Sequence, residues 1–173
     1  MVLSTMRTLF LFTVFASLVI CTALPAGAAG DPFAEGSVRM SVILGNGYAF
    51  DESYTVFGVG AGYFVAKGLE LALDGESWSG GSPGITKVSP GLRYVFSTGG
   101  AMRPYAGAFY RRTAIENYDD LDSYGGRAGL YFLFGQGGYF GLGGVYEKYL
   151  SCNESVYRSC TETYPELIFA IAL

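Results

Sequence analysis

Short runs in which apolar residues alternate with glycine or polar residues recur along this chain, and this period-two pattern most constrains its fold. Residues 57–76, FGVGAGYFVAKGLELALDGE, show the pattern. One set of alternate positions is apolar: Phe57, Val59, Ala61, Tyr63, Val65, Leu69, Leu71 and Leu73. The other set is Gly58, Gly60, Gly62, Phe64, Glu70, Ala72, Asp74 and Glu76. Successive side chains of a strand point to opposite faces, so each set covers one face of a sheet.

The same pattern predicts eight strands and no helix of useful length. The strands are expected near residues 37–50, 54–66, 68–78, 84–97, 103–116, 122–134, 137–150 and 164–173. Turn residues separate them, as in AKG, SGGSPG, STGGAMR and GQGG. Strands about ten residues long can cross a bilayer when they are tilted. The pattern therefore predicts an all-β protein, an eight-stranded antiparallel up-and-down transmembrane barrel over residues 30–173.

The breaks between the strands fall into two groups by length. AKG, STGGAMR and GQGG are short and contain glycine, whereas NYDDLDS and SCNESVYRSCTETY are longer and acidic. Outer-membrane barrels show this asymmetry, with short periplasmic turns and longer external loops. The break DES at residues 51–53 belongs to the external group by its position but is very short.

Charged residues gather on the face opposite the apolar one. Five are basic and five are acidic: Arg39, Lys87, Arg93, Arg112, Arg127, Glu70, Asp74, Glu76, Glu147 and Glu166. Charges drawn into a narrow lumen must be paired, because an unpaired buried ion costs several kcal/mol. Glycines on the same face make room for large side chains inside a small barrel. The polar face is therefore predicted to fill the lumen, and a soluble secreted barrel of the lipocalin type, with the apolar face inside, is the alternative.

Aromatic residues are assigned to the lipid-facing side. On the strand near residues 103–116 this places Tyr105 and Phe109 on the lipid face. Aromatic residues near strand ends predict the interfacial girdles of membrane barrels: Tyr48, Phe50, Tyr63, Phe96, Tyr105, Phe134 and Tyr149.

Residues 1–29 have the composition of a secretory signal peptide. Arg7 supplies the positive charge, an apolar run follows, and Ala26-Gly27-Ala28 supplies a cleavage frame. An uncleaved membrane anchor is the alternative. Cleavage removes Arg7 and no acidic residue, which leaves 10 basic and 15 acidic residues. This net negative charge opposes nucleic-acid binding.

Two cysteines remain after cleavage, Cys152 and Cys160. In an exported chain such a pair predicts one disulfide, and two free thiols are the alternative. The ring would enclose Tyr157 and Arg158, which are the candidate recognition residues because loops on a rigid scaffold commonly carry binding function. A ring that only protects the loop from proteases is the other interpretation.

The chain contains no histidine. This excludes nucleophilic sites of the Ser-His and Cys-His types and the usual zinc sites, so no enzyme, cofactor or metal site is predicted. Three carboxylates on one strand, Glu70, Asp74 and Glu76, could serve acid catalysis, but salt bridges with the lumen cations are the favoured interpretation. Glu116, Asp119, Asp120 and Asp122 do not have the spacing of a calcium loop and are expected to be solvated.

The segments GYFVAKGLELAL, VSPGLRYVF and RPYAGAFYRR resemble strand-and-turn blocks of the small eight-stranded outer-membrane barrels of Gram-negative bacteria, the class that includes the OmpA transmembrane domain, OmpX and OmpW. The resemblance implies a monomer in the bacterial outer membrane, in contact with lipid and lipopolysaccharide, inserted by the barrel-assembly machinery. That machinery reads a C-terminal strand ending in an aromatic residue, whereas ELIFAIAL ends in Leu173. The expected function is structural or surface interaction through the loops, around a plugged lumen. A narrow channel for small or apolar solutes is the alternative.

Overall fold

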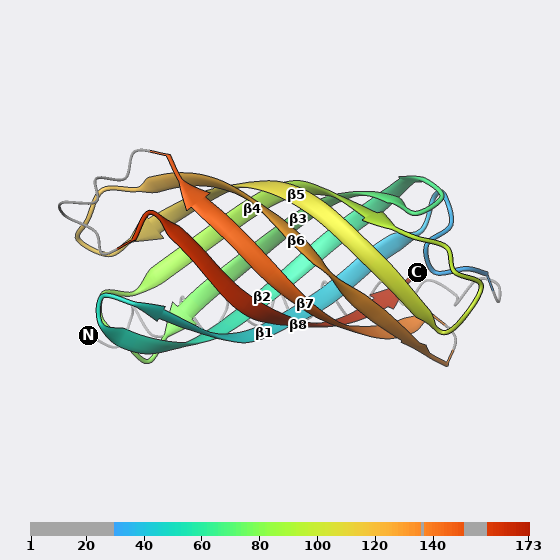
Figure 1. The fold of residues 1–173 in the computed structure, drawn as a ribbon, viewed down its shortest axis with the longest axis horizontal. Coiled ribbons are helices and arrows are strands. Elements are labelled where there is room, and N and C mark those ends of the chain that lie inside the picture. The colour runs from blue at the N-terminus through green and yellow to red at the C-terminus, as the bar shows by residue number, and fades with distance from the viewer. Residues whose placement is uncertain (1–29, 136, 151–158) are drawn as a thin grey trace, which may run out of the picture.

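Eight strands form one closed antiparallel barrel in a computed structural model that describes residues 30–135, 137–150 and 159–173 (Figure 1). The strands are β1 Val38–Ala49, β2 Glu52–Ala66, β3 Leu69–Ser79, β4 Ile85–Val95, β5 Met102–Ile115, β6 Leu121–Phe134, β7 Gly138–Tyr149 and β8 Thr161–Ala172. Each strand pairs with the next along the chain, and β8 closes the barrel against β1. The predicted all-β, eight-stranded antiparallel barrel is confirmed. The predicted signal peptide, residues 1–29, lies outside the described residues.

No helix in the described part of the chain is long and apolar enough to cross a membrane.

The two ends of the barrel differ. We call the end with the connections 50–51, 80–84, 116–120 and 150–160 the long-loop end. We call the other end the terminal end, because β1 begins there and β8 finishes there. The very short first connection has a local explanation. Phe50 and Asp51 have φ values of 50° and 60°, so both are left-handed and form a two-residue hairpin turn between Ala49 and Glu52.

The apolar faces of the strands point outward. Val59 and Leu73 are more than half exposed, whereas Glu70 and Asp74 are buried in the lumen. The outward apolar side chains of the other strands include Val42, Leu92, Leu130, Leu142 and Phe169. An apolar outer wall around a charged interior is the reverse of a soluble barrel. The lipocalin-type alternative, which places the apolar face inside, is therefore wrong.

The strand β5 has the opposite phase to the predicted one. Tyr105 and Phe109 were expected on the lipid face, but they are buried in the lumen at 2% and 6% exposure. The alanines between them, Ala106 and Ala108, face outward instead. Tyr105 therefore does not belong to the outer aromatic girdle. Tyr149 does not either, because its hydroxyl oxygen lies 3.3 Å from the Lys87 amine nitrogen in the lumen.

Close packing inside the lumen depends on glycine. The ring of Tyr131 lies over Gly141, with its Cε1 carbon 2.6 Å from the place where a Cβ on that residue would stand. The ring of Trp78 lies against Gly47 in the same way. Any larger side chain at these positions would displace an aromatic ring, so the glycines on the lumen face set the space that the aromatic rings fill.

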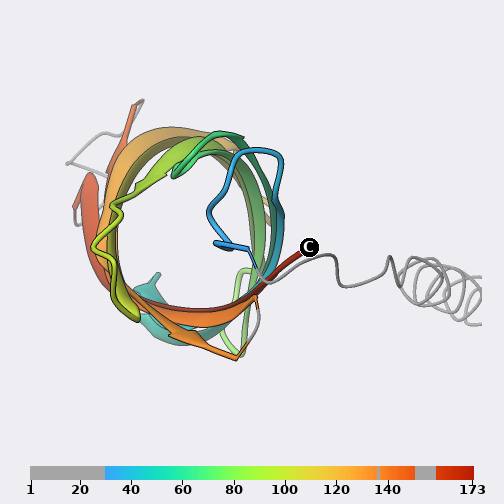
Figure 2. The ribbon, with the colours of Figure 1, turned by 90° about the vertical axis from the view of Figure 1, so that its right-hand side faces the viewer.

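A short segment before β1 closes the terminal end. Residues 30–37, which we call the N-terminal strap, fold across the opening of the barrel (Figure 2). The backbone amides of Gly36 and Gly68 donate hydrogen bonds of 2.8 Å to the carbonyl oxygens of Phe64 and Phe33. These bonds fix the strap to β2 and to the turn that follows it.

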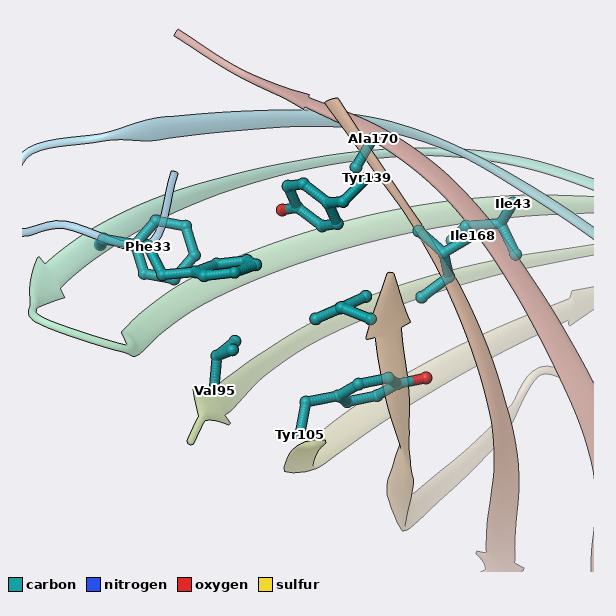
Figure 3. Close-up of a cluster of buried hydrophobic side chains, with 9 residues drawn as sticks. Phe33, Ile43, Val95, Tyr105, Tyr139, Ile168 and Ala170 are labelled. Carbon is teal, nitrogen blue, oxygen red and sulfur yellow. The ribbon is translucent and has the colours of Figure 1, made fainter. Parts of the chain in front are cut away.

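Phe33 carries the strap into the barrel and is only 2% exposed (Figure 3). Its ring centroid lies 5.0 Å from that of Tyr139 and 5.8 Å from those of Phe64 and Tyr131. These rings belong to one buried cluster with Val95, Tyr105, Ile43, Ile168 and Ala170. The terminal end of the lumen is therefore filled with packed apolar and aromatic side chains.

Candidate functional site in the barrel lumen

Next to the aromatic cluster, on its side toward the long-loop end, lies a buried network of ion pairs, which we call the terminal network. Its members are Arg39, Glu70, Asp74, Arg93, Arg127 and Glu166. The register places Glu70 of β3 directly opposite Arg93 of β4, and Arg93 Nη1 lies 3.1 Å from Glu70 Oε2. Arg93 Nη2 lies 3.3 Å from Asp74 Oδ2, so one guanidinium spans two carboxylates.

Two more arginines reach the same carboxylates from other strands. Arg39 on β1 donates from Nε to Glu70 and from Nη2 to Asp74 Oδ1 at 3.1 Å. Arg127 on β6 joins Asp74 Oδ2 at 2.9 Å to Glu166 Oε2 at 3.0 Å. The network thus connects β1, β3, β4, β6 and β8 across the lumen. Three basic and three acidic side chains balance, as burial of charge requires.

A second network, the loop-end network, lies toward the long-loop end. Its charged members are Glu76, Lys87, Arg111, Glu147 and Glu162. Arg111 lies 2.7 Å from both Glu76 Oε1 and Glu147 Oε2, and its Nε donates to Ser89 Oγ at 2.6 Å. The Lys87 amine lies 3.6 Å from carboxylate oxygens of Glu147 and Glu162. The two basic and three acidic residues give this network one excess negative charge.

Phe109 separates the two networks. The guanidinium carbon of Arg111 lies 4.6 Å from its ring centroid, and that of Arg127 lies 5.0 Å from it. A ring held between two guanidinium groups is favourable because each cation is attracted to the electron-rich face. The lumen is therefore layered: apolar strap and aromatic cluster, terminal network, Phe109, then loop-end network.

No family model and no curated protein sequence matches the chain. Solved structures do match. The N-terminal β-barrel domain of OprF from Pseudomonas aeruginosa superposes with a TM-score of 0.58 at 20% identity, covering 80% of this chain and 98% of that domain. Neisserial surface protein A superposes with a TM-score of 0.56 at 15% identity, covering 79% of this chain and 95% of that one. The chain has the fold of the small eight-stranded outer-membrane barrels.

Nine of the ten residues predicted to fill the lumen of this outer-membrane-barrel fold lie there, and one does not. Arg112 was predicted to point inward, but its side chain is 59% exposed on the outer surface, where it pairs with Asp120 at 2.8 Å and Asp122 at 3.3 Å. Arg111 occupies the lumen instead, with no exposed side-chain surface. The error has the same cause as that for Tyr105 and Phe109, because all three follow from the phase of β5.

Besides Arg111, three residues at the long-loop end of the lumen were not assigned by the sequence analysis: Glu162, Tyr164 and Trp78. Glu162 lies on β8, which begins at Thr161 rather than at residue 164 as predicted, and Tyr164 is the first residue of the predicted strand but was assigned to no face. Trp78 lies at the end of β3 and contacts Lys87. The alternation of TETYPE places Tyr164 in phase with Glu166, and a strand extended by three residues places Glu162 in the same phase.

The predicted recognition loop lies largely outside the described residues. This applies to Cys152, Tyr157 and Arg158, whereas Cys160 directly precedes β8. The Cys152–Cys160 disulfide and the recognition role of Tyr157 and Arg158 stay predictions.

Proposed function

We propose that this protein is an integral outer-membrane barrel with a closed lumen, which acts through the loops of its long-loop end as a structural or surface-interaction protein. The proposal includes export by a cleaved signal peptide, residues 1–29, and insertion by the barrel-assembly machinery as a monomer. Contact with outer-membrane lipid and lipopolysaccharide follows from the same placement. The apolar outer wall supports the membrane location, because lipid is the medium that such a wall matches.

The paired charges and packed rings inside the lumen are the single observation that supports this function. Each of the five buried basic side chains pairs with at least one carboxylate, and the N-terminal strap fills the terminal end. An ion crossing the barrel would have to break several buried pairs, each costly to separate in a medium of low polarity. An eight-stranded barrel is only wide enough for its own side chains. Loops therefore remain as the part of the molecule that can meet partners.

Conductance in planar lipid bilayers tests the closed lumen. The purified barrel is expected to give no steady current at moderate voltage. A steady, ion-selective current from the unmodified protein would replace the proposal by the alternative, a narrow channel. Neutralising Arg93 separates the two in a second way, because a plugged barrel then leaks or loses stability, whereas a channel changes its ion preference.

The membrane location is tested by gel mobility. Intact outer-membrane barrels resist sodium dodecyl sulfate and change mobility on heating. We expect a heat-dependent shift for the protein in the outer-membrane fraction. A soluble protein without a shift would contradict the location.

A further inference from the structure

Three aromatic rings surround the amine of Lys87 at the long-loop end of the lumen. The Lys87 nitrogen lies 4.0 Å from the ring centroid of Trp78, 5.9 Å from that of Tyr149 and 5.8 Å from that of Tyr164. Carboxylate oxygens of Glu147 and Glu162 lie 3.6 Å from the same nitrogen. Rings and carboxylates arranged in this way form an aromatic cage, the type of site that binds alkylammonium groups.

Three walls of this cage, Glu147, Trp78 and Tyr164, are held by contacts that do not involve Lys87. Arg111 and Ser123 hold the carboxylate of Glu147 at 2.7 Å and 2.6 Å. The indole nitrogen of Trp78 donates to Glu76 Oε2 at 3.2 Å, and its ring packs edge-on against Tyr164 with centroids 6.0 Å apart. These three walls are therefore expected to stay in place when the lysine side chain is removed or displaced. A preformed site needs little ordering when a ligand binds.

The charge and the position of the cage also favour a cation from outside. The loop-end network has one excess negative charge with Lys87 in place. Trp78 and Tyr149 lie at or next to the ends of β3 and β7, and Glu162 is the second residue of β8. The side chain of Glu162 is 26% exposed, whereas those of Lys87 and Glu147 are almost fully buried. Solvent thus reaches the cage from the long-loop end.

We infer that the cage of Trp78, Tyr149, Tyr164, Glu147 and Glu162 is a binding site for small alkylammonium ions, with the side chain of Lys87 as its built-in occupant. A free amine enters by displacing the lysine amine from the same rings and carboxylates. In the unmodified protein the lysine competes, so the apparent affinity is reduced by the fraction of molecules in which the cage is open. The inference rests on the closed lumen proposed above, but it is tested by a different signal.

Trp78 is the only tryptophan of the chain, so its fluorescence reports on the cage alone. The barrel is refolded in detergent micelles and titrated with butylammonium, which has the length and charge of the lysine side chain. The variant Lys87→Ala is expected to show a saturable change, with a half-saturation concentration at least about tenfold below that of the unmodified protein. Lys148→Ala, which removes an exposed lysine on the outer wall, is the matched control and should titrate like the unmodified protein.

Two further measurements keep the inference open to refutation. The double variant Lys87→Ala/Glu147→Gln should lose most of the gained affinity, and neutral butanol should give no saturable change with Lys87→Ala. A response to butanol equal to that of butylammonium, or equal half-saturation in Lys87→Ala and the unmodified protein, would overturn the cage as a cation site. A heat shift on gels verifies that each variant is folded, and a Lys87→Thr variant, whose side chain is also too short to fill the cage, replaces Lys87→Ala if the latter fails that check. Bilayer conductance of the unmodified protein tests the closed lumen separately.

Discussion

Removal of one arginine from the terminal network tests the layered lumen most directly. Arg93 is almost fully buried and pairs with Glu70 at 3.1 Å and with Asp74 at 3.3 Å. The substitution Arg93→Met keeps much of the apolar stem and leaves two basic against three acidic side chains in the network. Removing one partner of a buried ion pair costs about 3–5 kcal/mol, because the charge of the other partner then stays buried without compensation. We expect the free energy of unfolding to fall by that amount.

The double variant Glu70→Gln/Arg93→Met restores the balance, with two basic and two acidic side chains. Its loss of stability is expected to be smaller than the summed losses of Arg93→Met and Glu70→Gln by at least about 1 kcal/mol, the coupling expected between residues in direct contact. Denaturant titration of the refolded barrel, monitored by the fluorescence of Trp78 and by the heat shift on gels, measures both variants. If the double variant loses as much stability as the two single variants together, the charge-balance reasoning is refuted.

Three other substitutions test separate parts of the structure. Arg111→Met should lower the free energy of unfolding by about 3–5 kcal/mol because it leaves buried carboxylates unpaired. Arg112→Met, on the outer wall, should leave the unfolding midpoint unchanged. A larger loss for Arg112→Met than for Arg111→Met would contradict the placement of Arg111 in the lumen. Gly143→Ala should cost about 1–3 kcal/mol, because its Cβ would stand 2.8 Å from a backbone oxygen of β6, whereas Gly144→Ala meets nothing within 4 Å and should be tolerated in the same titration. Phe33→Ala should release the N-terminal strap, so the strap's amides should exchange with deuterium much faster while the heat shift of the barrel remains; unchanged exchange would contradict its role as an anchor.

Most of the fold follows from the sequence because glycine marks one phase of most strands. Where Gly58, Gly60 and Gly62 alternate with large apolar residues, only one assignment of faces fits. In β5 this mark is weak, because the only glycine of YAGAFYRR, Gly107, shares its phase with the large residues Tyr105 and Phe109, and two adjacent arginines put one charge in each phase. Its phase is set by pairing with β4 and β6, which places Arg93 opposite Gly107. Period-two reasoning within one strand cannot supply that register.

The partners within the lumen were only partly predictable. Glu70 and Arg93 lie on neighbouring strands, so a hairpin between β3 and β4 already brings them together. The pairing of Arg127 with Asp74 joins β6 to β3, which are not neighbours in the sheet. Such contacts depend on how far the strands are sheared when the barrel closes, and shear is a property of the whole sheet rather than of any one segment.

The N-terminal strap has a consequence for the order in which the molecule assembles. The rings that receive Phe33 come from β2, β6 and β7, so its docking site does not exist until strands from both halves of the chain are in place. Contacts between residues distant in sequence form late, since the intervening chain must be ordered first. Residues 30–37 are synthesised before any strand, yet the site that receives Phe33 is complete only once β2, β6 and β7 have come together.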